Sequence, residues 1–198
     1  MTKFPEDLRL YEHLLWESSP SVVIEVGVHH GASALWFRDR LATLERYGRV
    51  AQTRVIGIDV DIAAAERNLA GADPAWSQSI HLLQADICDD ETVRRALALV
   101  PPGAACLVVE DSAHEYATTF ASLRGFAHLI APGGFFVVED GCVDVDAMRL
   151  APDWPRGVQP AVREWLGSAE GRDFVQRRDL EIYGITCHPG GFLQRRTA

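Results

Sequence analysis

Short apolar runs alternate with longer amphipathic stretches along most of this chain. The runs predict strands at residues 21–26, 54–58, 79–83, 105–109 and 135–138. The stretches between them carry apolar residues at helical spacing and predict helices at about 5–17, beyond the turn at 27–31, and at about 62–69, 90–96, 116–129 and 158–166. This alternation predicts an α/β domain with a Rossmann-like, mostly parallel, doubly wound sheet.

The C-terminal part departs from the alternation. Residues 181–187 and 191–195 flank a Gly-rich turn, so we expect an antiparallel hairpin there. A length of 198 residues fits one domain. Within it we expect an N-terminal helix (1–20), a cofactor-binding core (21–140) and a third part (141–198) that holds an acceptor loop, a helix and the hairpin.

Carboxylates follow two of the predicted buried strands. Asp111 comes shortly after the strand at 105–109, and Glu139 and Asp140 follow the strand at 135–138. If these strands are neighbours, the three acids converge, with His114 as a candidate proton acceptor beside them. They would repel one another if unpaired, so a divalent ion such as Mg²⁺, or a basic side chain in its place, should lie among them. The alternatives are that Glu139 and Asp140 cap the next helix and that His114 is a surface residue or a cap.

A glycine-containing turn follows the first strand, where ligands bind in parallel α/β sheets. Gly27 and Gly31 allow a cofactor to approach the backbone, and Ser33 lies in the first turn of the next helix. His29 stands where a dinucleotide fingerprint has its middle glycine, which disfavours a pyrophosphate ligand. Glu25 either orients this turn or meets an amino group of the cofactor.

The second and third strands also end near acids. Asp59 is placed to accept the two ribose hydroxyls of a nucleoside, and Asp86 to accept from the amine of adenine, with Ile87 against the ring. Each acid alone could cap a helix. Their order along the chain, each at a strand end, favours a nucleoside site.

Charge and composition restrict the partners. The net charge is −9, and the basic residues form no stripe, which argues against nucleic acid as a ligand. The four cysteines show no metal or disulfide spacing, no apolar run is long enough for a membrane span, and no signal peptide is recognisable. We therefore expect a soluble, cytoplasmic protein.

Five segments carry a resemblance to a known family. They are residues 25–36 (EVGVHHGASALW), 55–62 (VIGIDVDI), 109–114 (VEDSAH), 135–140 (FFVVED) and 188–193 (HPGGFL). The chain resembles the class I S-adenosylmethionine-dependent methyltransferases of the cephalosporin hydroxylase family, which also includes macrolide-sugar O-methyltransferases. The resemblance implies S-adenosylmethionine and Mg²⁺ as cofactors, Asp111, Glu139 and Asp140 as metal ligands, His114 as the base, and assembly as homo-oligomers.

The resemblance leads to a concrete functional hypothesis. We expect methyl transfer to a hydroxyl of a small-molecule acceptor, a sugar or secondary metabolite, with Asp111 and His114 as the catalytic pair. Residues 153–157, which include Trp154, either cover the acceptor or pack on the last helix. Two other functions stay open: an NAD(P)-dependent oxidoreductase, which explains Asp59 but not the acids after the fourth and fifth strands, and a non-catalytic scaffold.

Overall fold

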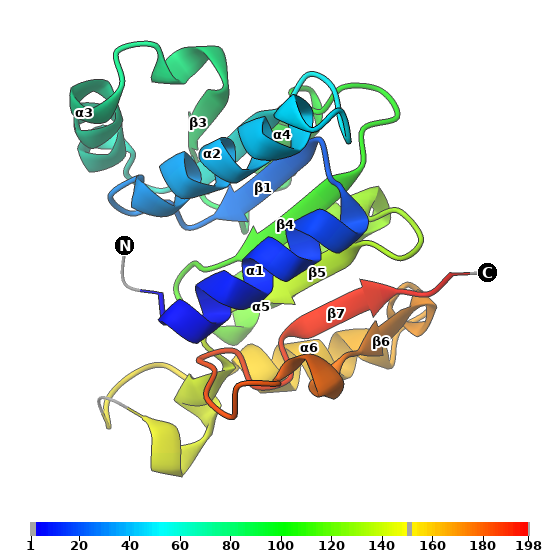
Figure 1. Cartoon of the computed structure of the whole chain (residues 1–198). Helices are drawn as coiled ribbons and strands as arrows, with labels where there is room; N and C mark the ends of the chain where they lie inside the picture. Colours follow the sequence, from blue (N-terminus) through cyan, green and yellow to red (C-terminus); the bar gives the residue numbers. More distant parts are fainter. Residues whose placement is uncertain (1–2, 150–151, 198) are drawn as a thin grey trace.

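Seven strands form one sheet in the computed structural model of this protein. The structure describes residues 3–149 and 152–197. Helices lie on both faces of the sheet (Figure 1). The helices are α1 (Pro5–Ser18), α2 (Ala32–Arg46), α3 (Ala63–Ala72), α4 (Asp90–Leu97), α5 (Tyr116–Phe126) and α6 (Val158–Leu166). The strands are β1 (Val22–Val26), β2 (Arg54–Asp59), β3 (Ile80–Gln84), β4 (Cys106–Glu110), β5 (Phe135–Val138), β6 (Phe174–Gln176) and β7 (Phe192–Arg195). The predicted α/β fold class is confirmed.

The strand order is β3-β2-β1-β4-β5-β7-β6. Strands β1 to β5 are parallel, whereas β7 runs antiparallel to both β5 and β6. Because β1 pairs with both β2 and β4, the strand order reverses beside β1. A ligand is expected beyond the carboxyl ends of the strands at such a point.

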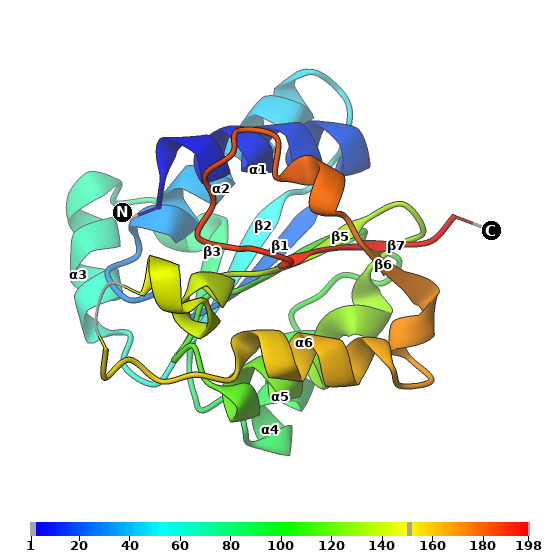
Figure 2. The same cartoon turned by 90° about the horizontal axis from the view of Figure 1, so that it is seen from below.

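Two apolar layers hold the helices against the sheet. Figure 2 shows α1 and α2 on one face and α4, α5 and α6 on the other. On the first face Phe37 and Leu41 of α2 pack with β1 and are fully buried. On the second face Phe126 and Trp165 pack against β4 and β5 in the same way. Burial on both faces explains why these strands read as continuous Val- and Ile-rich runs.

The pairing of the central strands continues one residue beyond their ends. Asp111 N–H donates to the Val26 carbonyl over 2.7 Å, and Glu139 N–H donates to the Glu110 carbonyl over 2.8 Å. The chain at Gly27 is tied in the same way to Ile58 of β2, over 2.8 Å. The acids therefore leave neighbouring strands side by side, as the sequence predicted.

The predicted C-terminal hairpin is corrected in its first strand. Residues 181–187 form no strand; β7 pairs instead with β6, at Phe174–Gln176. Gly184 has a φ of +70°, and Ile182 and Ile185 remain exposed, so the segment has neither the extended backbone nor the buried face of a strand. Phe174 does have a buried side chain, and it packs on Trp165.

Two helix ends also differ from the prediction. Asp89, not Asp90, caps α4 by accepting from Glu91 N–H over 2.9 Å. Helix α5 ends at Phe126, and residues 127–129 tighten into a 3₁₀ turn. Among the residues that the structure describes, none forms a helix that is long and apolar enough to span a membrane.

Gly27 generates the first testable prediction. Its φ is +92°, and a Cβ there would lie 1.9 Å from the carbonyl oxygen of Asp111. Gly27→Ala should lower the free energy of unfolding by at least about 3 kcal/mol, because strain and overpacking add. Gly48→Ala is the matched control: its φ is +69°, but no atom lies within 4 Å of the added Cβ. Thermal unfolding of both variants measures the difference, and equal losses would contradict the close approach.

Candidate active site

A buried lysine lies between two of the predicted metal ligands. The Lys3 ammonium donates to Asp111 Oδ2 and to Glu139 Oε1, each over 2.6 Å, and only 6% of its side chain is exposed. Burial acts to lower the pKa of Lys3, but the charges of Glu139 and Asp111 outweigh it and raise that pKa well above its usual range. The sequence predicted a divalent ion or a basic side chain among these acids, and the structure places the Lys3 side chain between two of them.

Glu139 faces the interior of the protein. The Tyr11 hydroxyl of α1 donates to the same Glu139 Oε1 over 2.6 Å, and the carboxyl is 2% exposed. The His188 ring lies on its other side, with Nε2 3.6 Å from Glu139 Oε2. His188 accepts from Asp140 N–H at Nδ1 over 3.0 Å, and burial lowers its pKa to about 4. This histidine is therefore neutral at pH 7 and fixes the backbone where the chain leaves β5.

Asp140 turns towards β4. It has a left-handed φ of 51°, and His114 has one of 59°. The His114 Nε2 lies 3.4 Å from Asp140 Oδ2, and ligand atoms of Asp111, His114 and Asp140 all lie within 4.8 Å of one another. Left-handed backbone at non-glycine residues costs about 1–3 kcal/mol and is concentrated at functional sites. The structure thus brings three of the four predicted residues into one cluster, with Glu139 joined to it through Lys3.

The acids of this cluster hold their protons unusually tightly. Burial, followed by the charge of Glu139, raises the pKa of Asp111 to about 6. Burial, followed by the charges of Asp111 and Glu139, raises the pKa of Asp140 to about 8. Burial lowers the pKa of His114, with Asp111 acting against it. His114 is therefore neutral near pH 7, as a proton acceptor must be.

Glu25 is a buried carboxyl without a hydrogen bond among the described residues. Both of its oxygens lack a partner. Burial raises its pKa to about 8, against the opposing charge of Lys3. Ser33, in the first turn of α2, is also buried. Both roles expected for Glu25, orienting the turn after β1 and meeting an amino group of the cofactor, stay predictions.

Asp59 holds the turn after β1. Its Oδ2 accepts from Val28 N–H over 2.8 Å and from His29 N–H over 2.7 Å. Gly31 begins α2 with a φ of +82° and packs near Ala65 of α3. The carboxyl thus fixes the turn that would receive the cofactor, in addition to its predicted contact with ribose.

Asp86 and Ile87 follow β3 as expected. Asp86 is exposed and accepts from Cys88 N–H over 2.9 Å, while Ile87 is 5% exposed and packs in the core. The nucleoside-binding roles of these two residues stay predictions. The structure adds that the Asp86 carboxylate stabilises the turn after β3 through its hydrogen bond from Cys88 N–H.

Trp154 lies close to His114. Their ring centroids are 6.1 Å apart, and Trp154 also packs against the apolar core on the α6 face. Trp154 thus lies beside the predicted base and also packs on the core that includes residues of α6. Its role in covering the acceptor stays a prediction. Residues 150 and 151 of the expected acceptor loop lie outside the described residues.

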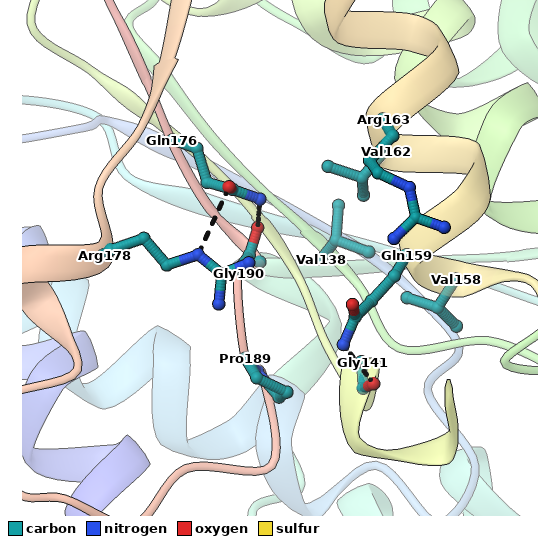
Figure 3. A pocket seen from close by; sticks show the side chains of 11 residues that line it. Val138, Gly141, Val158, Gln159, Val162, Arg163, Gln176, Arg178, Pro189 and Gly190 are labelled. Atoms are coloured by element: carbon teal, nitrogen blue, oxygen red, sulfur yellow. Dashed lines mark hydrogen bonds between the residues drawn. The ribbon is translucent and has the colours of Figure 1, made fainter. Parts of the chain in front are cut away.

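A separate pocket of about 80 Å³ lies between α6 and the turn before β7 (Figure 3). Gln159 and Arg163 line it from α6, opposite Gln176, Arg178 and Gly190. Gln176 Nε2 donates to the Gly190 carbonyl over 2.6 Å. None of the predicted site residues lines this pocket. We therefore place the chemistry at the carboxyl ends of β4 and β5, where the titratable groups meet.

Sequence reasoning missed Lys3, Tyr11 and Glu110. A signal for Lys3 was present: it is the only lysine among 19 basic residues, all others being arginine. Glu110, the last residue of β4, is buried and accepts from Thr119 Oγ1 over 3.1 Å. Burial raises its pKa to about 7. Its hydrogen bond ties β4 to α5, beside the turn that carries His114.

Comparisons with known proteins agree with this geometry. A family model described as Rhamnosyl O-methyltransferase/CmcI matches residues 1–196. The rhamnosyl O-methyltransferase of Mycobacterium leprae (strain TN) is 27% identical, over 98% of this chain and 80% of that protein. A solved structure of CmcI with Mg and SAM has a TM-score of 0.65 and 24% identity, over 100% of this chain and 74% of that one. CalS11, a TDP-rhamnose 3'-O-methyltransferase of calicheamicin biosynthesis, has a TM-score of 0.58 and 21% identity, over 83% and 69%.

The solved structures define the class of fold, that of the Rossmann-like methyltransferases. The chain belongs to the Rhamnosyl O-methyltransferase/CmcI family. It is an S-adenosylmethionine-dependent O-methyltransferase, and the resemblance inferred from its motifs is confirmed. This finding decides against the oxidoreductase and the non-catalytic scaffold.

Glu25 predicts a pH dependence of stability. Because its pKa is raised from 4.5 to about 8, the folded state binds this proton more tightly than the unfolded state. Its contribution is fully present below about pH 4.5 and is lost as the pH rises through about 8, with a slope of up to about 1.4 kcal/mol per unit. Urea unfolding of the ligand-free protein should show a smaller slope for Glu25→Gln. The exposed Glu66→Gln is the control, and an unchanged slope in Glu25→Gln would contradict the assignment.

Asp59 predicts a loss of cofactor affinity. Asp59→Ala leaves the N–H groups of Val28 and His29 without their acceptor and removes the expected ribose acceptor. Calorimetry should show S-adenosylhomocysteine binding weakened by at least about tenfold. Asp61→Ala removes an exposed carboxylate that, among the described residues, accepts only from Ala63 N–H, and this variant should bind nearly as the parent does. Equal affinities of the two variants would remove Asp59 from the site.

Proposed function

We propose that this enzyme methylates a hydroxyl of a sugar or sugar-bearing metabolite, with Mg²⁺ as a second cofactor. The observation that carries this proposal is the cluster of Asp111, His114 and Asp140 at the carboxyl ends of β4 and β5. The names of the relatives support a rhamnosyl group as the first acceptor to test. Homo-oligomeric assembly and a cytoplasmic location remain predictions from the sequence.

The residues present fit a hard divalent ion. A cation, the Lys3 ammonium, already lies between Asp111 and Glu139, and Asp140 lies beside Asp111. Mg²⁺ prefers oxygen ligands, so we assign Asp111, Glu139 and Asp140 as its ligands and leave His114 free. When bound, the ion would make neighbouring acceptor hydroxyls more acidic and fix their direction.

The protein's own residues supply the other steps. The turn held by Asp59 positions the cofactor, and the neutral His114 takes the proton of the attacking hydroxyl at Nε2. The new oxygen–carbon bond forms as the sulfur–methyl bond breaks, and the sulfonium becomes a neutral thioether. Trp154 beside His114 would exclude water from the acceptor side.

Incubation of the protein with S-adenosylmethionine, Mg²⁺ and a set of rhamnosides tests this function. Mass spectrometry should detect one added methyl group and an equal amount of S-adenosylhomocysteine. Excess EDTA should abolish turnover and leave S-adenosylhomocysteine binding nearly unchanged, because the acids belong to the acceptor side of the site. Full activity in EDTA would exclude the proposed role of Mg²⁺.

The role of His114 has its own test. His114→Ala should lower kcat by about 10²- to 10⁴-fold with nearly unchanged cofactor affinity. The matched control is His128→Ala, which removes a histidine from the 3₁₀ turn after α5, away from the cluster. If His114→Ala turns over at more than about a tenth of the parent rate, the proton leaves by another route.

A further inference from the structure

The N-terminal segment supplies the cation of the acid cluster. Lys3 precedes α1 by two residues, and its ammonium makes two ion pairs of 2.6 Å, with Asp111 after β4 and Glu139 after β5. Figure 1 shows this end of α1 on the side towards which the arrowheads of β1 and β4 point. The positive charge that pairs with Asp111 and Glu139 thus comes from a residue more than 100 positions away in the sequence.

The position of this lysine is specific. It is the only lysine in the chain, and the 18 arginines all lie elsewhere. A compact ammonium fits between two carboxylates where a planar guanidinium of larger size would need a different spacing. Its side chain is nearly as buried as that of Glu139, with exposures of 6% and 3%.

The ammonium and a divalent ion would need the same two carboxylates. Asp111 and Glu139 are both assigned as ligands of Mg²⁺, and both already accept from Lys3. Two cations on one pair of carboxylates would also repel each other at so short a distance. Binding of the ion therefore requires that Lys3 withdraws from at least one carboxylate.

The surrounding contacts determine which part can move. Helix α1 is anchored, because Asp7 accepts from Thr186 Oγ1 over 2.6 Å and from Cys187 N–H over 3.1 Å. Tyr11 is fully buried and bonded to Glu139. Phe4, the residue before the helix, is exposed and has no capping side-chain bond. The Phe4 carbonyl accepts from Leu8 N–H over 3.0 Å, so the chain is fixed up to Phe4, and the Lys3 side chain is the part that can swing outward while α1 stays in place.

We infer that Lys3 is a built-in counter-ion that holds the two carboxylates in position until a divalent ion displaces it. Lys3 is thus a positioning residue, and the position of its ammonium reports whether the ion is bound. This inference rests on the proposed assignment of Asp111, Glu139 and Asp140 as ligands. The geometry behind it is one ammonium that bridges two carboxylates from neighbouring strands, over 2.6 Å to each.

Metal binding to variants tests the competition. Mn²⁺, which suits oxygen ligands and can be followed by electron paramagnetic resonance, serves as the probe. Lys3→Met should bind Mn²⁺ at least about tenfold more tightly than the parent, because no ion pair has to break. Lys3→Arg, which keeps the charge, should not show this gain. Arg9→Met is the matched control, since it removes a positive charge from the exposed surface of the neighbouring helix α1.

Amine labelling of the unaltered protein gives a second test that does not depend on a variant's folding. Because the chain has one lysine, reductive methylation followed by peptide mass spectrometry reports on Lys3 alone, apart from the α-amino group. Lys3 should react slowly in the metal-free protein and at least about fivefold faster with saturating Mn²⁺. Calorimetry with S-adenosylhomocysteine confirms that each sample is folded.

The outcomes separate the two proposals. Tighter Mn²⁺ binding by Lys3→Met together with faster labelling supports the counter-ion role. Equal Mn²⁺ affinities of parent and Lys3→Met, or unchanged labelling while Mn²⁺ is bound, overturns that role and leaves the metal site intact. Absence of Mn²⁺ binding in both proteins overturns the metal assignment itself, and the counter-ion inference with it.

Discussion

Charge compensation at the carboxyl ends of β4 and β5 is the constraint on which this site depends. Asp111, Glu139 and Asp140 leave two adjacent strands, and Glu25 lies buried nearby. Buried carboxylates are stable only when they are paired, hydrogen-bonded or protonated. The structure uses all three solutions, with Lys3 as the partner of two acids, Tyr11 as a donor, and raised pKa values at Glu25 and Asp140.

This compensation links distant parts of the chain. Lys3 and Tyr11 come from the N-terminal region, whereas His188 comes from the turn before β7 and fixes the backbone of Asp140. Asp7 completes the connection by binding the backbone of Cys187. The acceptor side of the site is therefore a product of both ends of the chain packed on the same edge of the sheet. Removal of either end should disturb the acids before it disturbs the cofactor turn.

The cofactor side is built differently. There the backbone itself forms the ligand surface, and one carboxylate, that of Asp59, holds it through N–H groups of Val28 and His29. Gly27 and Gly31 supply the left-handed backbone that this turn needs. Because few side chains are involved, the same turn can bind one cofactor while the acids, His114 and Trp154 are free to suit a particular acceptor.

The sequence by itself determined the order of elements, the fold class and the positions of the acids. Apolar periodicity depends on neighbouring residues and is visible in the chain, so β1 to β5 could be predicted to within one residue at each end and their helices to within about three. Strand ends in a parallel sheet share one edge, so the convergence of Asp111, Glu139 and Asp140 could be predicted as well. Tertiary structure alone decided which cation meets them. Lys3 is 108 residues from Asp111 and 136 from Glu139, and no local pattern encodes a contact over that separation. The same holds for the pairing of β6 with β7, where Gly184 and the buried Phe174 override an apolar pattern that suggested a strand at 181–187.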